Sequence, residues 1–311
     1  MGVIGDLLFT TAFLASAVRL AVPIILAAAG EVISERAGIL NIGLEGMMLM
    51  GAFTGVVAAD VSGSPWVGAI AAGVGGLLLA SLHGYVVIRW AGDQIVSGFA
   101  LNLGALGLTT YLSRQIFDTT QQQVVPHFVP VDLPILSDLP VLGPVVFQQT
   151  PFFYLAVALA IVLGFVLFRT SLGLRWRAAG ESPDALDSVG TSVARTRWQA
   201  LLVAGFMAGL GGGAISLGQL FTFIEGMTGG RGFVALALVI VTRWRPVWVI
   251  SVALFFGAAD AIALRVQALD IASIPFQISL MIPFVLTLVV YGFAARSGRP
   301  PHALGRPWLK S

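Results

Sequence analysis

Few side chains of this sequence could do chemistry, and most of them interrupt long apolar runs. Asn41 and Glu45 stand four residues apart in ILNIGLEGMM, a spacing that predicts one face of a helix. Asn102 ends a second stripe of polar and small residues, QIVSGFALN, with Phe99 beside it. A charged side chain in a bilayer costs at least about 2.5 kcal/mol, so it needs a partner or water. Two interpretations of Glu45 stay open: pairing with Arg36 at the membrane surface, or lining a polar pathway.

A further group of candidates surrounds a glycine-rich break in FTFIEGMTGGRGFVALALVIVTRW. The apolar part, 233–242, is too short to cross a bilayer, so the segment is either a half-length helix or one span broken at GMTGGRG. Broken helices are tolerated where the freed backbone lines protein or a watery cavity, and transporters place substrates there. The predicted pathway residues are therefore Asn41, Glu45, Phe99, Asn102, Gln219, Phe223 and Arg231.

Other features predict packing rather than chemistry. Arg19 precedes Pro23 by four residues, and Pro23 cannot donate to the carbonyl of residue 19, so the guanidinium is expected to satisfy freed carbonyls. Glycines at a four-residue period in AGFMAGLGGGAISLG predict a close approach of helix backbones. Asp260, near the predicted outer end of its span, is expected to be solvated.

The sequence lacks the residues of common catalytic and metal sites. The only lysine is Lys310, so no GxxxxGK[ST] phosphate loop can form and ATP hydrolysis would need another chain. The chain has no Cys, and His83, His127 and His302 are scattered, which gives no transition-metal cluster and no thiol nucleophile. We predict no catalytic residue, no metal site and no cofactor bound by this chain, which argues against an enzyme.

The elements that must position these residues are membrane-spanning helices. With 311 residues, 57% of them hydrophobic, and a mean hydropathy of +0.93, the chain is predicted to be an all-α polytopic membrane protein and a single domain, 1–311. About nine helices, one of them half-length, follow from apolar runs of about 20 residues. The predicted spans are 6–29, 38–60, 66–90, 94–113, 151–168, 198–220, 231–242, 246–264 and 277–293.

The distribution of basic residues predicts the orientation, because cytoplasmic loops carry an excess of Lys and Arg. Thirteen of the 17 basic residues fall on one side: Arg36, Arg89, Arg169, Arg175, Arg177, Arg195, Arg197, Arg243, Arg245, Arg296, Arg299, Arg306 and Lys310. This bias places the N-terminus outside and the C-terminus in the cytoplasm, and it leaves no basic patch for nucleic acid. The longest outer connection, 114–150, contains five prolines and is predicted to be an extended external loop without a long helix.

The longest inner connection, 169–197, is unusually polar and contains signals for a short helix. Ser182 suits an N-cap, Pro183 the first helical position, Asp184 the positive end of the helix dipole, and Gly190 the stop. An isolated helix this short is marginal in water, so we expect a partner surface. A solvated loop turn is the alternative on physical grounds alone.

The stretch RAAGESPDALDSVGTSV resembles the coupling-helix region of permease subunits of ATP-binding-cassette (ABC) importers. GEVISERAGILNIGLEGMMLMGAF (30–53), GMTGGRGFVALALVIVTRWRP (226–246) and IPFVLTLVV resemble the nucleoside and simple-sugar permeases in particular, a branch of the branched-chain amino acid permease superfamily. The resemblance implies coupling residues Arg177, Gly180, Glu181, Pro183, Asp184, Ala185 and Gly190. Glu181 stands where many members have Asn.

The resemblance also implies partners: a cytoplasmic ATPase that binds ATP and Mg, a second homologous permease, and an external substrate-binding lipoprotein, in the bilayer of the bacterial cytoplasmic membrane. An importer of nucleosides is the leading hypothesis and simple sugars come second. The amide and aromatic candidates, Phe99, Asn102, Gln219 and Phe223, suit a nucleobase but also a pentose. An ion-coupled secondary transporter should show buried coupling carboxylates and a pseudo-symmetric repeat, and the sequence shows neither clearly. A structural scaffold would leave the polar helix and the broken span unexplained.

Overall fold

The computed structural model describes residues 10–117, 124–132, 134, 136–268, 281, 285–286, 289, 292 and 299–308, and they are mostly helical. The helices are α2 (Thr11–Arg36), α3 (Leu44–Ser62), α4 (Pro65–Gly84), α5 (Gln94–Ile116), α6 (Pro151–Arg169), α7 (Ser171–Glu181), α8 (Pro183–Ser188), α9 (Val193–Ile215), α10 (Arg231–Val241) and α11 (Pro246–Ala268). Three π-helical turns are η1 (Tyr85–Arg89), η2 (Gly143–Phe147) and η3 (Ser216–Leu220). Strand β1 (Val131–Asp132) pairs antiparallel with β2 (Gln148–Gln149).

Seven of these segments are long and apolar enough to cross a membrane: α2, α3, α4 with η1, α5, α6, α9 with η3, and α11. The expected half-length helix is α10, which begins after the glycine-rich break. The predicted last span, 277–293, lies mostly outside the described residues. The membrane-spanning helical fold is therefore confirmed, whereas the count of nine stays a prediction.

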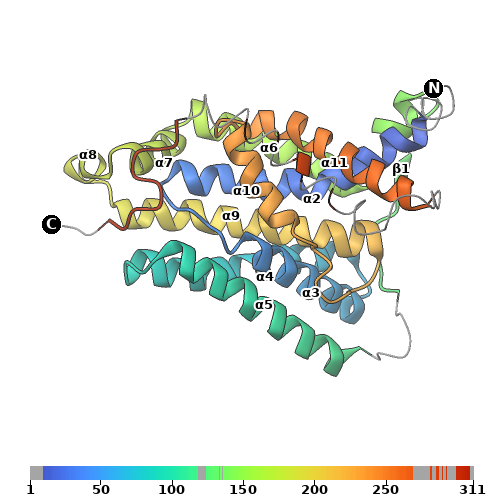
Figure 1. Cartoon of the computed structure of the whole chain (residues 1–311), viewed down its shortest axis with the longest axis horizontal. Coiled ribbons are helices and arrows are strands. Elements are labelled where there is room, and N and C mark those ends of the chain that lie inside the picture. Colours follow the sequence, from blue (N-terminus) through green and yellow to red (C-terminus); the bar gives the residue numbers. More distant parts are fainter. Residues whose placement is uncertain are drawn as a thin grey trace.

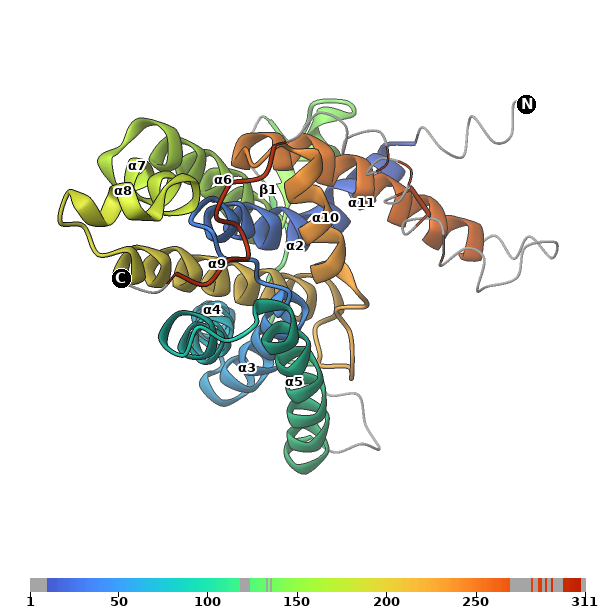
Figure 2. The same ribbon diagram turned by 60° about the vertical axis from the view of Figure 1, so that its left-hand side comes forward.

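The bundle has two distinct ends, which we call the α8 end and the β1 end after the elements that lie there (Figure 1). Helix α2 runs between the two ends through the middle of the bundle, and 299–308 returns along the α8 end beside α7 and α9 (Figure 2). At the β1 end, part of the connection 117–150 packs against η3 and against Phe221, the residue that follows η3. The amides of Val125 and Phe128 donate to the carbonyls of Phe221 and Leu217 at 3.0 and 2.9 Å.

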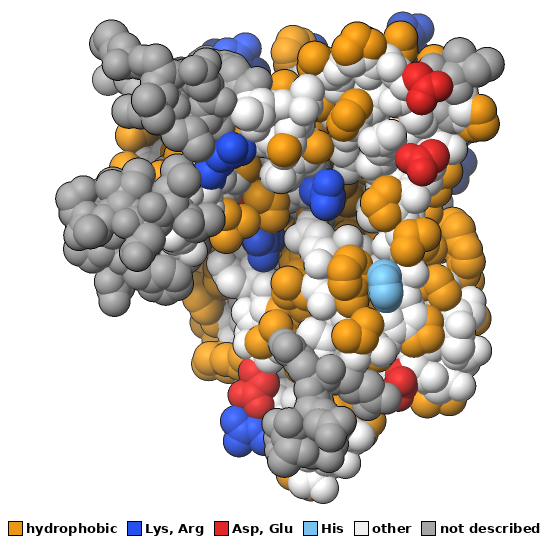
Figure 3. All heavy atoms as spheres, turned by 90° about the vertical axis from the view of Figure 1, so that its right-hand side faces the viewer, with side chains coloured by type: hydrophobic (Ala, Val, Ile, Leu, Met, Phe, Trp, Pro, Cys, Tyr) orange, Lys and Arg blue, Asp and Glu red, His pale blue; other side chains and the backbone are white. Residues whose placement is uncertain are grey.

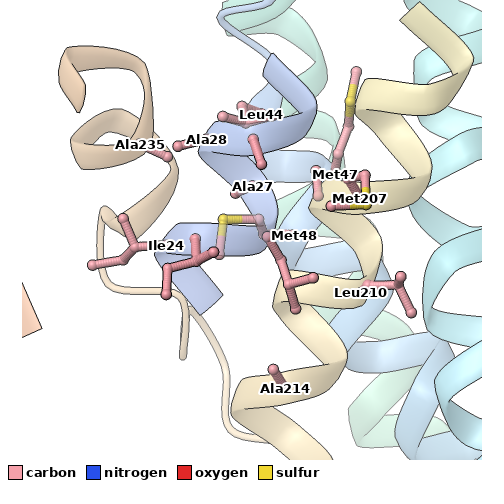
Figure 4. Close-up of a cluster of buried hydrophobic side chains, with 14 of the residues drawn as sticks. Ile24, Ala27, Ala28, Leu44, Met47, Met48, Met207, Leu210, Ala214 and Ala235 are labelled. Atoms are coloured by element: carbon pink, nitrogen blue, oxygen red, sulfur yellow. The ribbon is translucent and has the colours of Figure 1, made fainter. Parts of the chain in front are cut away.

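The core centres on α2, α3 and α9, to which α4, α6, α10 and α11 add buried side chains, with small side chains at the closest contacts. In Figure 4, Ala28 of α2 lies beside Ala235 of α10, and Met47 of α3 lies beside Met207 of α9, within one cluster of buried side chains. Helix α9 contributes the predicted glycine contacts. A Cβ at Gly212 would overlap the Met48 carbonyl oxygen, and one at Gly209 would overlap that of Ala72 in α4. The predicted close approach of backbones is confirmed.

The connection between α2 and α3 differs from the sequence prediction of a span over 38–60. Helix α2 continues to Arg36, Gly38 adopts a left-handed φ of +90°, and α3 begins only at Leu44. Asn41 is therefore outside any helix, and the prediction that Asn41 and Glu45 share a helix face is wrong. Hydropathy could not detect the break because the apolar residues continue across it.

Helix α5 is the least covered of the candidate spans. Only 22% of its apolar window is buried, against 83% for α9 with η3. Figures 1 and 2 both place α5 on the side of the bundle opposite α6 and α11. Its side chains therefore present a long apolar face, which includes Ile95, Phe99 and Leu103.

Candidate functional site

The short polar helix predicted from the inner connection exists as α8, held against the bundle at the α8 end. Ser182 occupies the N-cap position but its hydroxyl makes no capping hydrogen bond, and Pro183 is the first helical residue. Gly190 has a left-handed φ of +78° after the helix ends. Leu186 packs inward against Ala179 and Val193. The opposite face of α8 carries the exposed Asp184, Ala185 and Ser188, followed by Val189, which is 74% exposed.

The C-terminal segment 299–308 fastens α7 and α8, a contact that the sequence did not suggest. The indole Nε1 of Trp308 donates to Asp184 Oδ1 at 3.0 Å, and the amide of Ala303 donates to the Gly180 carbonyl at 2.8 Å. Arg197 Nη1 donates to the Arg306 carbonyl at 3.0 Å, and Arg197 is nearly fully buried. A lone tryptophan in a basic, proline-rich tail was the available signal.

The remaining predicted coupling residues lie where α7 meets the end of α2. Gly180 is buried, and a Cβ there would overlap the carbonyl oxygen of Arg36. Glu181 Oε1 lies 3.9 Å from Arg36 Nη1, and the guanidinium of Arg177 stacks over Phe168 at 5.5 Å. Any displacement of α7 and α8 therefore acts directly on the α2 backbone.

A second group of contacts is centred on Glu45 of α3, which binds the glycine-rich segment before α10. Its Oε1 accepts from Thr228 Oγ1 at 2.6 Å and from the amide of Gly230 at 2.8 Å, while Oε2 accepts from the amide of Gly232 at 2.6 Å. The carboxylate thus sits at the positive N-terminus of α10, where an anion is stabilised. The expected alternative of pairing with Arg36 is not what the structure shows.

Asn102 and Asn41 fasten the same α2–α3 connection. Asn102 Oδ1 accepts from the amide of Gly46 at 2.8 Å, and its Nδ2 donates to the Ile42 carbonyl at 2.9 Å. Asn41 is fully buried, and its backbone N–H donates to Glu31 Oε1 at 3.1 Å. Glu45 and the two asparagines therefore tie α2, α3, α5 and α10 into one polar layer.

Phe99 and Arg231 border this layer. The Phe99 ring lies 6.5 Å from that of Phe233, and the two side chains are 50% and 41% exposed. Arg231 Nε lies 3.9 Å from Asp260 Oδ2, and the side chain of Asp260 is only 18% exposed. The expectation of a solvated Asp260 was wrong, because α11 packs this residue toward the start of α10.

Gln219 and Phe223 lie apart from the other predicted pathway residues. Gln219 Nε2 donates to the carbonyl of Arg19 at 2.8 Å, and this is the carbonyl that Pro23 leaves without its helical donor. The side-chain amide of Gln219, in η3, therefore satisfies this carbonyl in place of the Arg19 guanidinium. Phe223 packs edge to face on Phe53 at 5.3 Å.

We expect Gln219→Leu to destabilise the protein without changing substrate recognition, because it removes the side-chain donor from the Arg19 carbonyl, to which Pro23 cannot donate. The cost should be about 1–2 kcal/mol, measured as a lower midpoint of thermal unfolding in detergent. Gln199→Leu, which changes an exposed glutamine of α9, is the control. An unchanged midpoint with an altered KM for uptake would instead place Gln219 in the pathway.

Within the described ranges, no group of three or more His, Cys, Asp or Glu side chains is arranged to hold a metal ion. The site consists of two parts: the exposed helix α8 at one end of the bundle, and the polar layer that joins α2, α3, α5 and α10. The chain was compared with sequence models of protein families. The family described as the permease component of branched-chain amino acid transport systems matches residues 13–291. The chain belongs to this permease family. The family resemblance read from the sequence is thereby confirmed.

The permease is similar along most of its length to transport proteins of several organisms. It is 38% identical to NupQ of Bacillus subtilis, a guanosine ABC transporter permease, over 93% of this chain and 94% of that protein. It is 35% identical to NupC of Lactococcus lactis, a nucleoside ABC transporter permease, over 93% and 94%. TsgB13 of Haloferax volcanii, a glucose ABC transporter permease, is 29% identical over 86% and 74%.

A solved ABC transporter in an inward-facing conformation resembles the permease in fold. The TM-score is 0.52 at 18% identity, over 91% of this chain and 84% of that one. The seven apolar helices and the relatives make the permease a multi-pass protein of the bacterial inner membrane.

Proposed function

We propose that this permease is the membrane subunit of an ABC importer and carries nucleosides into the cell, while a partner ATPase binds and hydrolyses ATP. The observation that carries the proposal is the full-length likeness to two nucleoside permeases at 38% and 35% identity. The geometry agrees, because α8 offers an exposed face at one end of the bundle and is braced from behind. A simple sugar is the alternative cargo, since a glucose permease is also a relative.

The α8 end is proposed to face the cytoplasm. It carries most of the basic residues, including Arg169, Arg175, Arg195 and Arg243, as expected for inner loops. Seen from the β1 end, the surface shows scattered charges among hydrophobic side chains (Figure 3). Nine crossings, with the N-terminus outside and the C-terminus inside, fit this orientation, in which 114–150 is external and 169–197 is the cytoplasmic coupling loop.

A path of direct contacts suggests how movement of α8 reaches the membrane interior. Gly180 presses on the end of α2, the α2–α3 connection follows, and Glu45 at the start of α3 holds the loop before α10. Closure of the ATPase pair against α8 would thus shift α3 and α10 together as a rigid body. Phe99 and Arg231, beside this loop, are the residues we place nearest the cargo.

Two further partners, a second permease and an external lipoprotein, are proposed to bind the α5 face and the β1 end. The exposed apolar face of α5 is proposed to pack on a second, homologous permease, so that the pathway forms between the two. The β1 end is proposed to receive the external lipoprotein that delivers the cargo. Selection among nucleosides is expected mainly in that lipoprotein.

The test is uptake into proteoliposomes that contain the permease with its second permease, ATPase and lipoprotein. We expect ATP-dependent accumulation of labelled guanosine or uridine that requires all four proteins. Uptake of glucose but not of nucleosides would replace the cargo by a sugar. Uptake driven by an ion gradient without ATP would overturn the ABC assignment.

A further inference from the structure

The connection between α10 and α11 forms a basic hollow at the α8 end. Its cavity of about 460 Å³ is lined by four arginines, Arg36, Arg243, Arg245 and Arg299, and by Trp244 and Trp248. None of the described residues that line it is acidic. Arg243 and Arg245 are exposed, and neither makes an ion pair with any described residue. Such a concentration of guanidinium groups calls for an anion.

The turn that presents these arginines is held in shape from inside. Arg36 donates through Nε to the Trp244 carbonyl at 3.2 Å and through Nη2 to the Arg243 carbonyl at 3.3 Å. The Trp244 indole Nε1 donates to the buried Glu35 at 2.5 Å. Arg243 and Trp244 both adopt left-handed backbone angles, with φ of 52° and 55°. The hollow is thus a built feature in which Trp244 faces inward and Arg243 outward.

A second, apolar hollow of about 300 Å³ adjoins the first and shares Arg245 and Trp248 with it. Its other lining residues are Phe168 at the end of α6, and Pro246 and Val247 at the start of α11. Trp248 is 58% exposed, and Val247 is 49% exposed. A basic cavity thus continues into an apolar groove beside two membrane-spanning helices, at the level where tryptophan favours the membrane interface.

We propose that this double hollow binds an anionic phospholipid, with its phosphate among Arg243, Arg245 and Arg299 and its acyl chains along Phe168, Val247 and Trp248. Basic pockets between membrane-spanning helices bind anionic head groups in this way. A free phosphate would satisfy the arginines but would leave the apolar groove empty. Helices α6 and α11 lie on the side opposite α5 (Figure 2), so the hollow faces the bilayer if the second permease packs on α5 as proposed.

The test uses the full-length permease in its assembled complex, with dioleoyl phosphatidylglycerol as the anionic probe and dioleoyl phosphatidylcholine as the neutral one. Bound lipid is counted by native mass spectrometry. Arg243→Gln with Arg245→Gln should weaken phosphatidylglycerol binding by about fivefold for each charge and leave phosphatidylcholine unchanged. The matched control, Arg89→Gln with Arg195→Gln, removes two exposed arginines of the same end outside the hollow and should have no such effect.

A second measurement does not depend on removing charge. Phosphatidylglycerol with brominated chains should quench tryptophan fluorescence more than brominated phosphatidylcholine, and Trp248→Phe should remove that difference. Equal binding of the two lipids, or equal losses in both arginine pairs, would overturn the proposal. Displacement of the brominated lipid by millimolar inorganic phosphate would assign the site to a free anion. If Arg243→Gln with Arg245→Gln loses ATPase association but binds both lipids as the wild type does, the hollow is a protein-binding surface.

Discussion

Glu45→Leu is expected to abolish transport and to destabilise the permease. The substitution leaves Thr228 Oγ1 and the amides of Gly230 and Gly232 without their acceptor, and it removes the negative charge from the N-terminus of α10. Hydrogen bonds to a charged group contribute about 1.5–3 kcal/mol each, and the net loss should be at least about 3 kcal/mol. The thermal midpoint in detergent should therefore fall by roughly 5–10 °C.

Glu45→Gln is the matched variant, because the carboxamide keeps one acceptor oxygen and nearly the same shape. It should fall between the wild type and Glu45→Leu in both stability and uptake rate. Uptake into proteoliposomes and thermal unfolding are measured on the same preparations. If Glu45→Leu transports at the wild-type rate, the loop before α10 is not moved through Glu45.

Ala185→Arg should uncouple the permease from its ATPase without unfolding it. Ala185 is exposed on the outer face of α8, whereas Leu186 anchors the helix from behind, so the new side chain disturbs no core contact. In a closed interface an unpaired guanidinium costs at least about 3 kcal/mol, which corresponds to at least about 100-fold weaker association. Pull-down of the ATPase and ATP-driven uptake report the effect.

Ser62→Arg adds the same charge to an exposed position at the β1 end and should leave ATPase association intact. Ala185→Ser, which adds a small neutral group, should transport nearly normally. ATPase association and uptake that survive Ala185→Arg unchanged would show that α8 is not the coupling surface.

Local signals predicted much of the fold. Apolar runs located the seven long helices, and Pro183 and Gly190 bounded α8, because proline and glycine act through their own backbone. The start of α3 was placed too early, at residue 38 instead of Leu44, since Ile39, Leu40 and Ile42 are apolar although they lie in the connection. Where the sequence varies little in hydropathy, the location of a helix end depends on packing and could not be predicted.

The polar layer shows the corresponding limit for the site. Glu45 and Asn102 were selected because polar groups in a membrane need partners, and Arg231 because it follows the glycine-rich break. Glu45 and Arg231 lie at the start of α10, whereas Asn102 holds the α2–α3 connection. Their partners could not be predicted: Glu45 binds backbone amides some 185 residues away in sequence, and Gln219 serves a carbonyl in α2. Such pairings arise from tertiary folding, and no local spacing encodes them.

The glycine contacts among α3, α4 and α9 limit how this permease can change shape. At Gly209 and Gly212 the helices touch through backbone atoms, so no side chain can change its rotamer to let one helix slide past the other. These three helices should therefore keep fixed mutual distances while access alternates. Because the chain has no native cysteine, pairs of cysteines introduced across α4 and α9 would cross-link in every state and provide an internal ruler.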